Sequence, residues 1–119
     1  MAQTRQNYLF VCYANSQRSP TAEEVCREIA RVNDLEIDAS SAGISKGADR
    51  PLTKEMADKA DQIFVMEDCM KTRLVQDYEQ NPGKIVCLEI PDIYNRDDPI
   101  LIHILESKLY GFFAEEGLL

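Results

Sequence analysis

Short apolar runs alternate along the chain with segments in which apolar residues recur every three or four positions. The clearest runs cover residues 8–12, 62–66 and 84–88. Runs of this length that are rich in aromatic and β-branched residues are typical of strands buried on both faces. A weaker strand is expected over residues 35–41, before a Ser-Ala-Gly sequence. The pattern therefore predicts four strands embedded in a mixed α/β chain.

The segments between these strands have helical spacing. A helix is expected from Ser19-Pro20 onward, because proline is favoured in a first helical turn. Its apolar stripe comprises Ala22, Val25, Cys26, Ile29 and Ala30. Further helices are expected over residues 51–59 and 67–78 and from Asp98-Pro99 onward, the last with an apolar face of Leu101, Ile104, Leu105, Leu109 and Phe112. Strands that alternate with helices predict a parallel sheet covered on both faces.

Length and charge narrow the class of protein. The 119 residues fit one domain over residues 1–119, and the net charge of -8 disfavours binding to nucleic acid. No apolar run approaches the roughly 20 residues that span a bilayer, so no membrane association is expected. The polar start of the chain lacks the apolar core of a signal peptide, which predicts a cytoplasmic location. The sequence leaves the oligomeric state open.

The four cysteines, Cys12, Cys26, Cys69 and Cys87, are expected to be single buried thiols in a reducing compartment. No pair has the spacing of metal ligands, and His103 is the only histidine. It lies off the apolar face of the last predicted helix, so it is expected at the surface. No metal and no other cofactor is predicted.

Cys12 and Arg18 enclose a five-residue loop between a predicted strand and a predicted helix. Loop amides and the positive end of a following helix can bind phosphate oxygens, and the same field favours the thiolate of a cysteine. Arginine offers a planar fork for two of those oxygens. The placement also fits a buried thiol at a strand end and a solvated arginine at a helix start. On spacing and context, the catalytic interpretation is favoured.

Residues 11–23 read V-C-Y-A-N-S-Q-R-S-P-T-A-E and resemble the signature loop V-C-x-G-N-x-C-R-S-P-x-A-E of the low-molecular-weight protein tyrosine phosphatases. Residues 40–43, S-S-A-G, resemble a second block of that family. Residues 60–67, A-D-Q-I-F-V-M-E, resemble a third, usually F-D-x-I-x-x-M-D. The blocks occur in the family's order and span most of the chain.

The resemblance implies a three-layer, Rossmann-like sandwich with a four-stranded parallel sheet and the active loop after the first strand. It implies a phosphatase that hydrolyses phosphate monoesters, with protein phosphotyrosine as the expected substrate and a small aryl phosphate as an alternative. Cys12 would be the nucleophile, Arg18 the phosphate clamp, and Asn15, bonded to Ser41, the residue that holds the loop. Ser19 would assist the thiolate. The substrate-binding loop would comprise Tyr13, Ala14, Asn15, Ser16, Gln17 and Ser19.

Three features depart from the family pattern. Ala14 replaces a glycine, which would cost about 1 kcal/mol if the position needs a positive φ. Gln17 replaces the second loop cysteine, which in relatives can trap the nucleophile as a protective disulfide. The stretch from Gly43 to Asp61 is shorter than usual, so a more open site is expected.

Phosphoryl transfer to a cysteine needs a proton donor for the leaving oxygen. The family uses an aspartate in an Asp-Pro-aromatic loop near the C-terminus. Asp92 matches in position, and Asp98 matches in its Asp-Pro dipeptide. Asp92 is favoured, since Asp98 also fits a helix N-cap before Pro99. Tyr94 would flank a phenyl ring or be an ordinary loop aromatic, and an acidic to neutral pH optimum is expected.

Three other functions stay open at this point. Arsenate reductases of the thioredoxin-coupled branch share this fold and loop, but they need a cysteine relay at closer spacing than that of Cys69 and Cys87. Phosphocysteine carriers of sugar-transport phosphorelays lack the loop arginine, so Arg18 argues against that role. A non-catalytic module would bind a phosphoprotein without turning it over.

Overall fold

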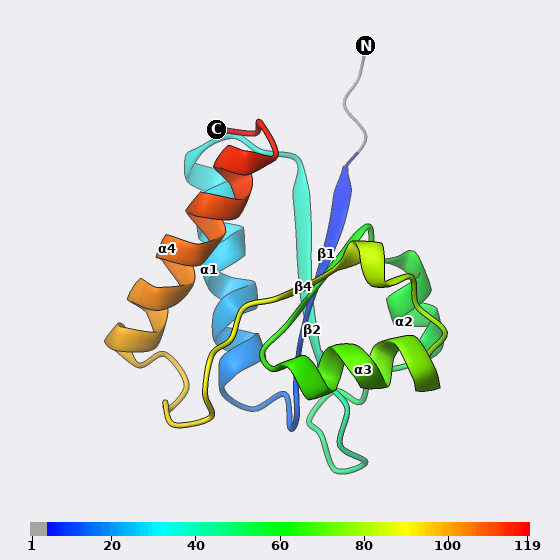
Figure 1. The fold of residues 1–119 in the computed structure, drawn as a ribbon. Helices are drawn as coiled ribbons and strands as arrows, with labels where there is room; N and C mark the ends of the chain where they lie inside the picture. Colours follow the sequence, from blue (N-terminus) through cyan, green and yellow to red (C-terminus); the bar gives the residue numbers. More distant parts are fainter. Residues whose placement is uncertain (1–4) are drawn as a thin grey trace.

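Four parallel strands form the centre of the protein in a computed structural model that describes residues 5–119 (Figure 1). Strand β1 (Gln6–Cys12) lies between β2 (Ile37–Gly43) and β3 (Gln62–Val65), and β4 (Ile85–Cys87) completes the order β2-β1-β3-β4. The registers pair the last residue of β1, Cys12, with Gly43. All four strands therefore end at the same edge of the sheet.

Helices cover both faces of this sheet. Helices α1 (Arg18–Val32) and α4 (Pro99–Glu115) lie together on one face, and α2 (Lys54–Lys59) and α3 (Asp68–Asp77) lie on the other (Figure 1). A short 3₁₀ turn, Pro82–Lys84, precedes β4. This arrangement confirms the predicted α/β sandwich with a four-stranded, all-parallel sheet. Among the described residues, no helix is both long enough and apolar enough to cross a bilayer.

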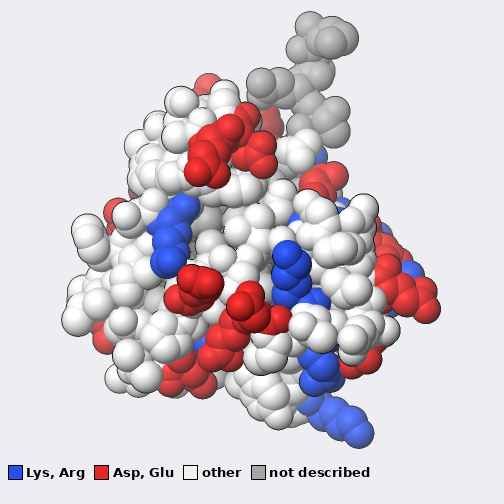
Figure 2. Space-filling view, viewed as in Figure 1, with Lys and Arg blue, Asp and Glu red and all other residues white. Residues whose placement is uncertain are grey.

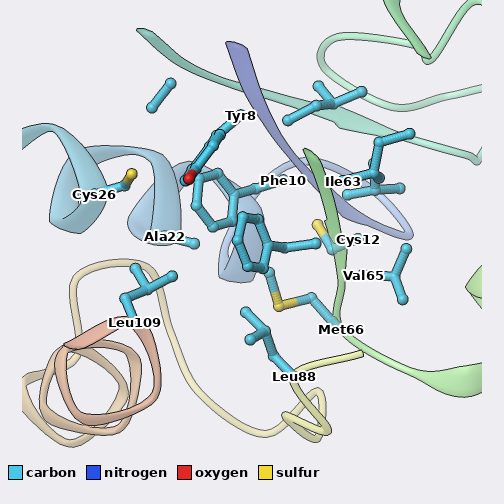
Figure 3. Packing of buried hydrophobic residues seen from close by; sticks show 14 of the residues in the cluster. Tyr8, Phe10, Cys12, Ala22, Cys26, Ile63, Val65, Met66, Leu88 and Leu109 are labelled. Atoms are coloured by element: carbon cyan, nitrogen blue, oxygen red, sulfur yellow. The ribbon is translucent and has the colours of Figure 1, made fainter. Parts of the chain in front are cut away.

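The core lies on both sides of β1, whose residues from Tyr8 to Cys12 are all buried. Phe10 stacks on Phe64 of β3 with ring centroids 4.9 Å apart. Figure 3 shows Phe10 between the sheet and α1, with Ala22 and Cys26 facing it from the helix. All five residues of the predicted α1 stripe are buried, as their spacing requires.

Two predicted elements differ in detail. Helix α2 begins at Lys54 rather than near Pro51, because the side chain of Thr53 accepts a hydrogen bond from the Met56 amide and caps it there. Pro51 instead pairs with Gly43 in an isolated bridge. On α4 the fully buried residues recur every four positions and are Leu101, Leu105, Leu109 and Phe113. Phe112, which was expected on the apolar face, is only half-buried.

The sheet order places a natural crevice at the carboxyl end of β1. The chain leaves β1 toward α1 on one face, whereas the neighbouring β3 leads to α3 on the opposite face. Ligands of open α/β sheets bind at such switch points. The segment after β1, residues 13–17, is thus placed where a ligand site is expected.

Candidate active site

Cys12 ends β1 with its side chain at the bottom of the following loop, and only 3% of the residue is exposed. Two hydrogen-bonding groups converge on its sulfur. The Asn15 amide donates to Sγ at 3.2 Å, and the Ser19 hydroxyl lies 2.9 Å from Sγ. The structure therefore gives Ser19 the contact with Cys12 that the sequence predicts.

Asn15 shapes the loop through its backbone and its side chain. Its φ of 54° lies in the left-handed region, which asparagine tolerates better than most residues. This turn directs the amide of Asn15 back to the sulfur of Cys12, while its Nδ2 donates to Ser19 Oγ at 2.8 Å. Ala14 has no positive φ, so the cost expected for alanine in place of glycine does not arise.

The expected hydrogen bond between Asn15 and Ser41 is absent among the described residues. The side-chain amide of Asn15 donates instead to Ser19, four residues along the chain. Ser41, on β2, donates its hydroxyl to Glu23 of α1 at 2.8 Å instead. Both side chains are buried and satisfied, but by different partners. Ser41 thus supports the start of α1 rather than the loop.

Gly43 forms the floor under the loop. A Cβ atom at this position would lie 2.7 Å from the Tyr13 carbonyl oxygen and 2.8 Å from the Asn15 nitrogen. Either distance is far inside van der Waals contact. The Ser-Ala-Gly block therefore ends in glycine because the loop backbone passes directly over it.

Helix α1 begins at Arg18 without a side-chain cap. Gln17 occupies the N-cap position, and no side chain accepts from the first amides of the helix. Tyr13 is 57% exposed beside the loop, whereas Ser16 and Gln17 are half-buried. Free amides at a helix start attract anions, and the helix dipole is positive there.

Arg18 is buried to 2% exposure at the same helix start. Its Nη1 donates to the Ile90 carbonyl oxygen at 2.7 Å. The same Nη1 lies 3.5 Å from Glu67 Oε1, and Nε lies 3.6 Å from Asp92 Oδ1. A buried guanidinium fixed from several directions has little freedom, so its fork has a defined orientation.

Among the groups that contact Arg18, Glu67 was expected in a helix and was given no role from the sequence. It directly precedes α3, and its side chain turns to Arg18 instead of capping that helix. The available signal was topological: Glu67 follows β3 closely, and β3 ends at the same sheet edge as β1. Ile90 contributes only a backbone carbonyl, which no side-chain pattern reveals.

The two candidate acids occupy different places. Asp92 reaches Arg18 with a side chain that is 64% exposed, so it stands at the mouth of the loop. Asp98 caps α4: its Oδ1 accepts from the Ile100 amide at 2.8 Å, with Pro99 at the first helical position. Tyr94 is half-buried and packs against the core cluster. The structure thus brings Asp92, and not Asp98, to Arg18.

All four cysteines are free thiols. Cys26 lies in the core, where burial raises its pKa to about 12. Cys87 is half-buried, and burial raises its pKa, with the nearby carboxylate of Asp68 acting in the same direction. Cys69 is exposed, contrary to the expectation of buried thiols, because it lies on the solvent side of the first turn of α3.

The rim of the site is acidic. Figure 2 shows acidic side chains gathered over the segment that links β4 to α4 and over the start of α3. Glu67, Asp68, Glu89 and Asp92 all belong to these two segments, and all four are at least partly exposed. Within residues 5–119, no group of three or more His, Cys, Asp or Glu side chains is arranged to hold a metal ion.

Comparisons with solved structures find the same fold. The low molecular weight protein tyrosine phosphatase from T. tengcongensis is 21% identical, with a TM-score of 0.76 over 92% of this chain and 99% of that chain. The tyrosine phosphatase Wzb from Escherichia coli K30, in complex with phosphate, is 21% identical, with a TM-score of 0.73 over 94% of this chain and 99% of its own.

A variant of the YwlE arginine phosphatase of Bacillus subtilis, with a phosphorylated active-site serine, is 20% identical, with a TM-score of 0.72 over 96% of this chain and 100% of that chain. Among curated proteins, no sequence matches this chain significantly. The family model for low molecular weight phosphotyrosine protein phosphatase matches residues 7–60, the segment that runs from β1 through α2. In this segment the chain is similar to the low molecular weight phosphotyrosine protein phosphatase family, and it has the α/β fold of that family's solved structures.

Proposed function

We propose that this protein hydrolyses phosphate monoesters, with phosphotyrosine in proteins as its substrate class, through a phosphocysteine formed on Cys12. One observation carries the proposal. The sulfur of Cys12, held at 3.2 Å by the Asn15 amide, shares the open N-terminus of α1 with the buried Arg18. A thiolate, a set of free amides and a fixed guanidinium are what attack on a phosphate requires.

In the first step the Cys12 thiolate attacks phosphorus from the loop. A sulfur–phosphorus bond forms, and the bond from phosphorus to the substrate oxygen breaks. Arg18 and the amides of the loop neutralise charge on the three other phosphate oxygens. Nη1 of Arg18 is already engaged by Ile90, so the edge formed by Nε and Nη2 serves the phosphate.

Asp92 supplies the proton to the leaving oxygen. Its Oδ1 lies 3.6 Å from Nε of Arg18. A phosphate that occupies this edge of Arg18 displaces the ion pair and gives Asp92 a negative neighbour, which favours its protonated form. The exposed position of Asp92 at the loop mouth suits a group that exchanges protons with solvent.

In the second step a water molecule attacks the phosphocysteine. Asp92, now a carboxylate, takes a proton from that water, the sulfur–phosphorus bond breaks, and inorganic phosphate leaves. The Ser19 hydroxyl, 2.9 Å from Sγ, stabilises the departing thiolate. The chemistry closes without any cofactor.

Tyr13 is the residue that would contact the phenyl ring of the substrate. Its ring is 57% exposed immediately after Cys12, so it can pack against a phenyl group whose phosphate lies in the loop. Two of the similar structures are named tyrosine phosphatases and one an arginine phosphatase, which makes phosphoarginine the substrate to compare.

The test is a pH–rate profile on p-nitrophenyl phosphate for the wild type and for Cys12→Ser and Asp92→Asn. Cys12→Ser is expected to lose activity by at least about a thousandfold while its circular dichroism spectrum stays native. Asp92→Asn is expected to lose about a hundredfold and the basic limb of the profile. Asp98→Asn keeps a capping side chain at α4 and serves as the matched control with wild-type kinetics.

Phosphate binding without turnover by the wild type would refute hydrolysis and identify a phosphate-binding module. Equal rates for Cys12→Ser and the wild type would refute the nucleophile. Peptides that carry phosphotyrosine or phosphoarginine at the same position then test the substrate class, and a preference for phosphoarginine would contradict the role given to Tyr13.

A further inference from the structure

A groove with a volume of about 280 Å³ lies between α1 and α4, apart from the loop of Cys12. Its floor is apolar and comes from both helices: Val25, Ile29 and Val32 of α1, and Ile102 and Tyr110 of α4. Figure 1 shows these two helices side by side on the same face of the sheet. Val32 is 61% exposed and Tyr110 39%, so apolar surface reaches the solvent here.

The rim of this groove has charge of one sign only. Glu24, Glu28, Asp97 and Glu106 line it, and no lysine or arginine does. Arg96 and Arg31 lie outside the lining and pair with Glu24 and Glu28. For Asp97 and Glu106, no cation lies within ion-pair distance among residues 5–119. An apolar slot framed by carboxylates complements a ligand that is apolar in the middle and cationic at its edges.

We infer that the α1–α4 groove binds a segment of a partner protein that inserts an apolar side chain between the helices and places lysine or arginine over Asp97 and Glu106. The groove's volume suits one or two side chains. A second copy of this chain is a poor occupant, because its net charge of -8 would oppose the acidic rim. Nucleic acids and anionic membranes are repelled for the same reason.

The groove also touches the segment that carries Asp92. Asp97 lines the groove, and its backbone amide donates to Thr21 Oγ1 of α1 at 3.0 Å. Thr21 is one helical turn from Arg18. A bound segment therefore lies next to the site without covering the loop of Cys12.

The test measures binding of a fluorescein-labelled helical peptide made only of leucine and lysine, by anisotropy at physiological salt. The wild type is expected to bind it, and the same peptide with glutamate in place of lysine is expected not to bind. Glu106→Lys should weaken binding by at least about fivefold, through repulsion of the peptide's lysines. Glu115→Lys, an exposed carboxylate of α4 outside the groove lining, is the matched control and should leave binding within about twofold.

A second variant separates capture of apolar side chains from attraction of charge. Val32→Ser leaves the charge unchanged and removes exposed apolar surface, and it should weaken binding about threefold or more. Cys12→Ser should bind like the wild type, since the groove does not use the thiol. Absence of binding by the wild type, equal weakening by Glu115→Lys, or no effect of Val32→Ser would each overturn the inference. A wild-type dimer in sedimentation that Glu106→Lys dissociates would also overturn it and make a second copy the occupant.

Discussion

Helices α1 and α4 lie side by side on one face of the sheet, but their first turns are completed differently. At α4, the carboxylate of Asp98 accepts from the Ile100 amide and Pro99 occupies the first position, so the helix supplies its own anion. At α1, Gln17 makes no such bond, and its backbone, with φ of -130° and ψ of -69°, is not in the extended form of a capping residue.

The same division holds across the four α-helices of residues 5–119. Thr53 caps α2 and Asp98 caps α4, whereas α1 and α3 have no side-chain cap. The two uncapped helices are those that follow β1 and β3, at the crevice, and Glu67 before α3 turns to Arg18 instead. A missing cap costs about 1 kcal/mol, so these two helix starts lack stabilisation that the starts of α2 and α4 have.

Among changes at the two helix starts, the largest effect is expected at Arg18, the residue that most distinguishes the start of α1. Arg18→Lys should lower kcat/KM for p-nitrophenyl phosphate by about a hundred- to a thousandfold, because lysine offers a point charge instead of a planar fork. Arg27→Lys on the same helix is the control and should act like the wild type. Retained activity in Arg18→Lys would show that α1 and α4 do not differ in function.

Inorganic phosphate should stabilise the protein by completing the start of α1. At a concentration of a hundred times its dissociation constant, the gain is about 2.7 kcal/mol, measurable as a rise in Tm. Sodium chloride at equal ionic strength is the control. If phosphate raised the Tm of Arg18→Lys as much as that of the wild type, the anion would bind elsewhere.

Stability at alkaline pH tests how closely the middle of α1 packs against the sheet. Burial raises the pKa of Cys26 from 9.0 to about 12 and that of Tyr8 from 10.0 to about 12. The folded state thus retains protons that the unfolded chain releases at alkaline pH. The free energy of unfolding is therefore at its full value below about pH 9 and falls as the pH rises to 12. The loss is about 1.4 kcal/mol per pH unit for each of the two groups. Urea unfolding at several pH values measures how steeply the free energy of unfolding falls with pH, and Cys26→Ala should make this fall less steep. An unchanged pH dependence in Cys26→Ala would show that Cys26 is not buried in solution.

The smallest effect is expected at the start of α4. Asp98→Ala should lower the free energy of unfolding by about 1 kcal/mol, and Asp98→Asn, which can still cap, by much less. Turnover should be unchanged in both, since Asp98 bonds to its own helix. A loss of activity in Asp98→Ala at wild-type stability would reassign the acid from Asp92.

Prediction from the sequence succeeded where the signal was local. The spacing of Ala22, Val25 and Cys26 located the buried face of α1, because a helix has one period whatever surrounds it. Ser19 could be placed near Cys12 because the turn between them is short. Asp98-Pro99 gave both a helix start and a competing catalytic assignment, and the structure resolves the dipeptide as a cap.

Contacts between residues far apart in the sequence were harder to predict. Glu67 and the Ile90 carbonyl reach Arg18 from segments about 50 and 70 residues away, and their approach depends on how the strands order themselves. The partner expected for Ser41 was wrong for a similar reason: the choice between Asn15 and Glu23 depends on how α1 sits over β2. Pairings of this kind follow from packing and not from residue type.

Gly43 has a consequence for how this protein tolerates mutation. Because the carbonyl of Tyr13 and the amide of Asn15 pass within 3 Å of where its Cβ would stand, even alanine at position 43 would lift the loop away from the sulfur. In a library of random substitutions selected for turnover, Gly43 should be depleted almost as strongly as Cys12. Part of the information that shapes the loop is thus held in a neighbouring strand, at a residue with no reactive group of its own.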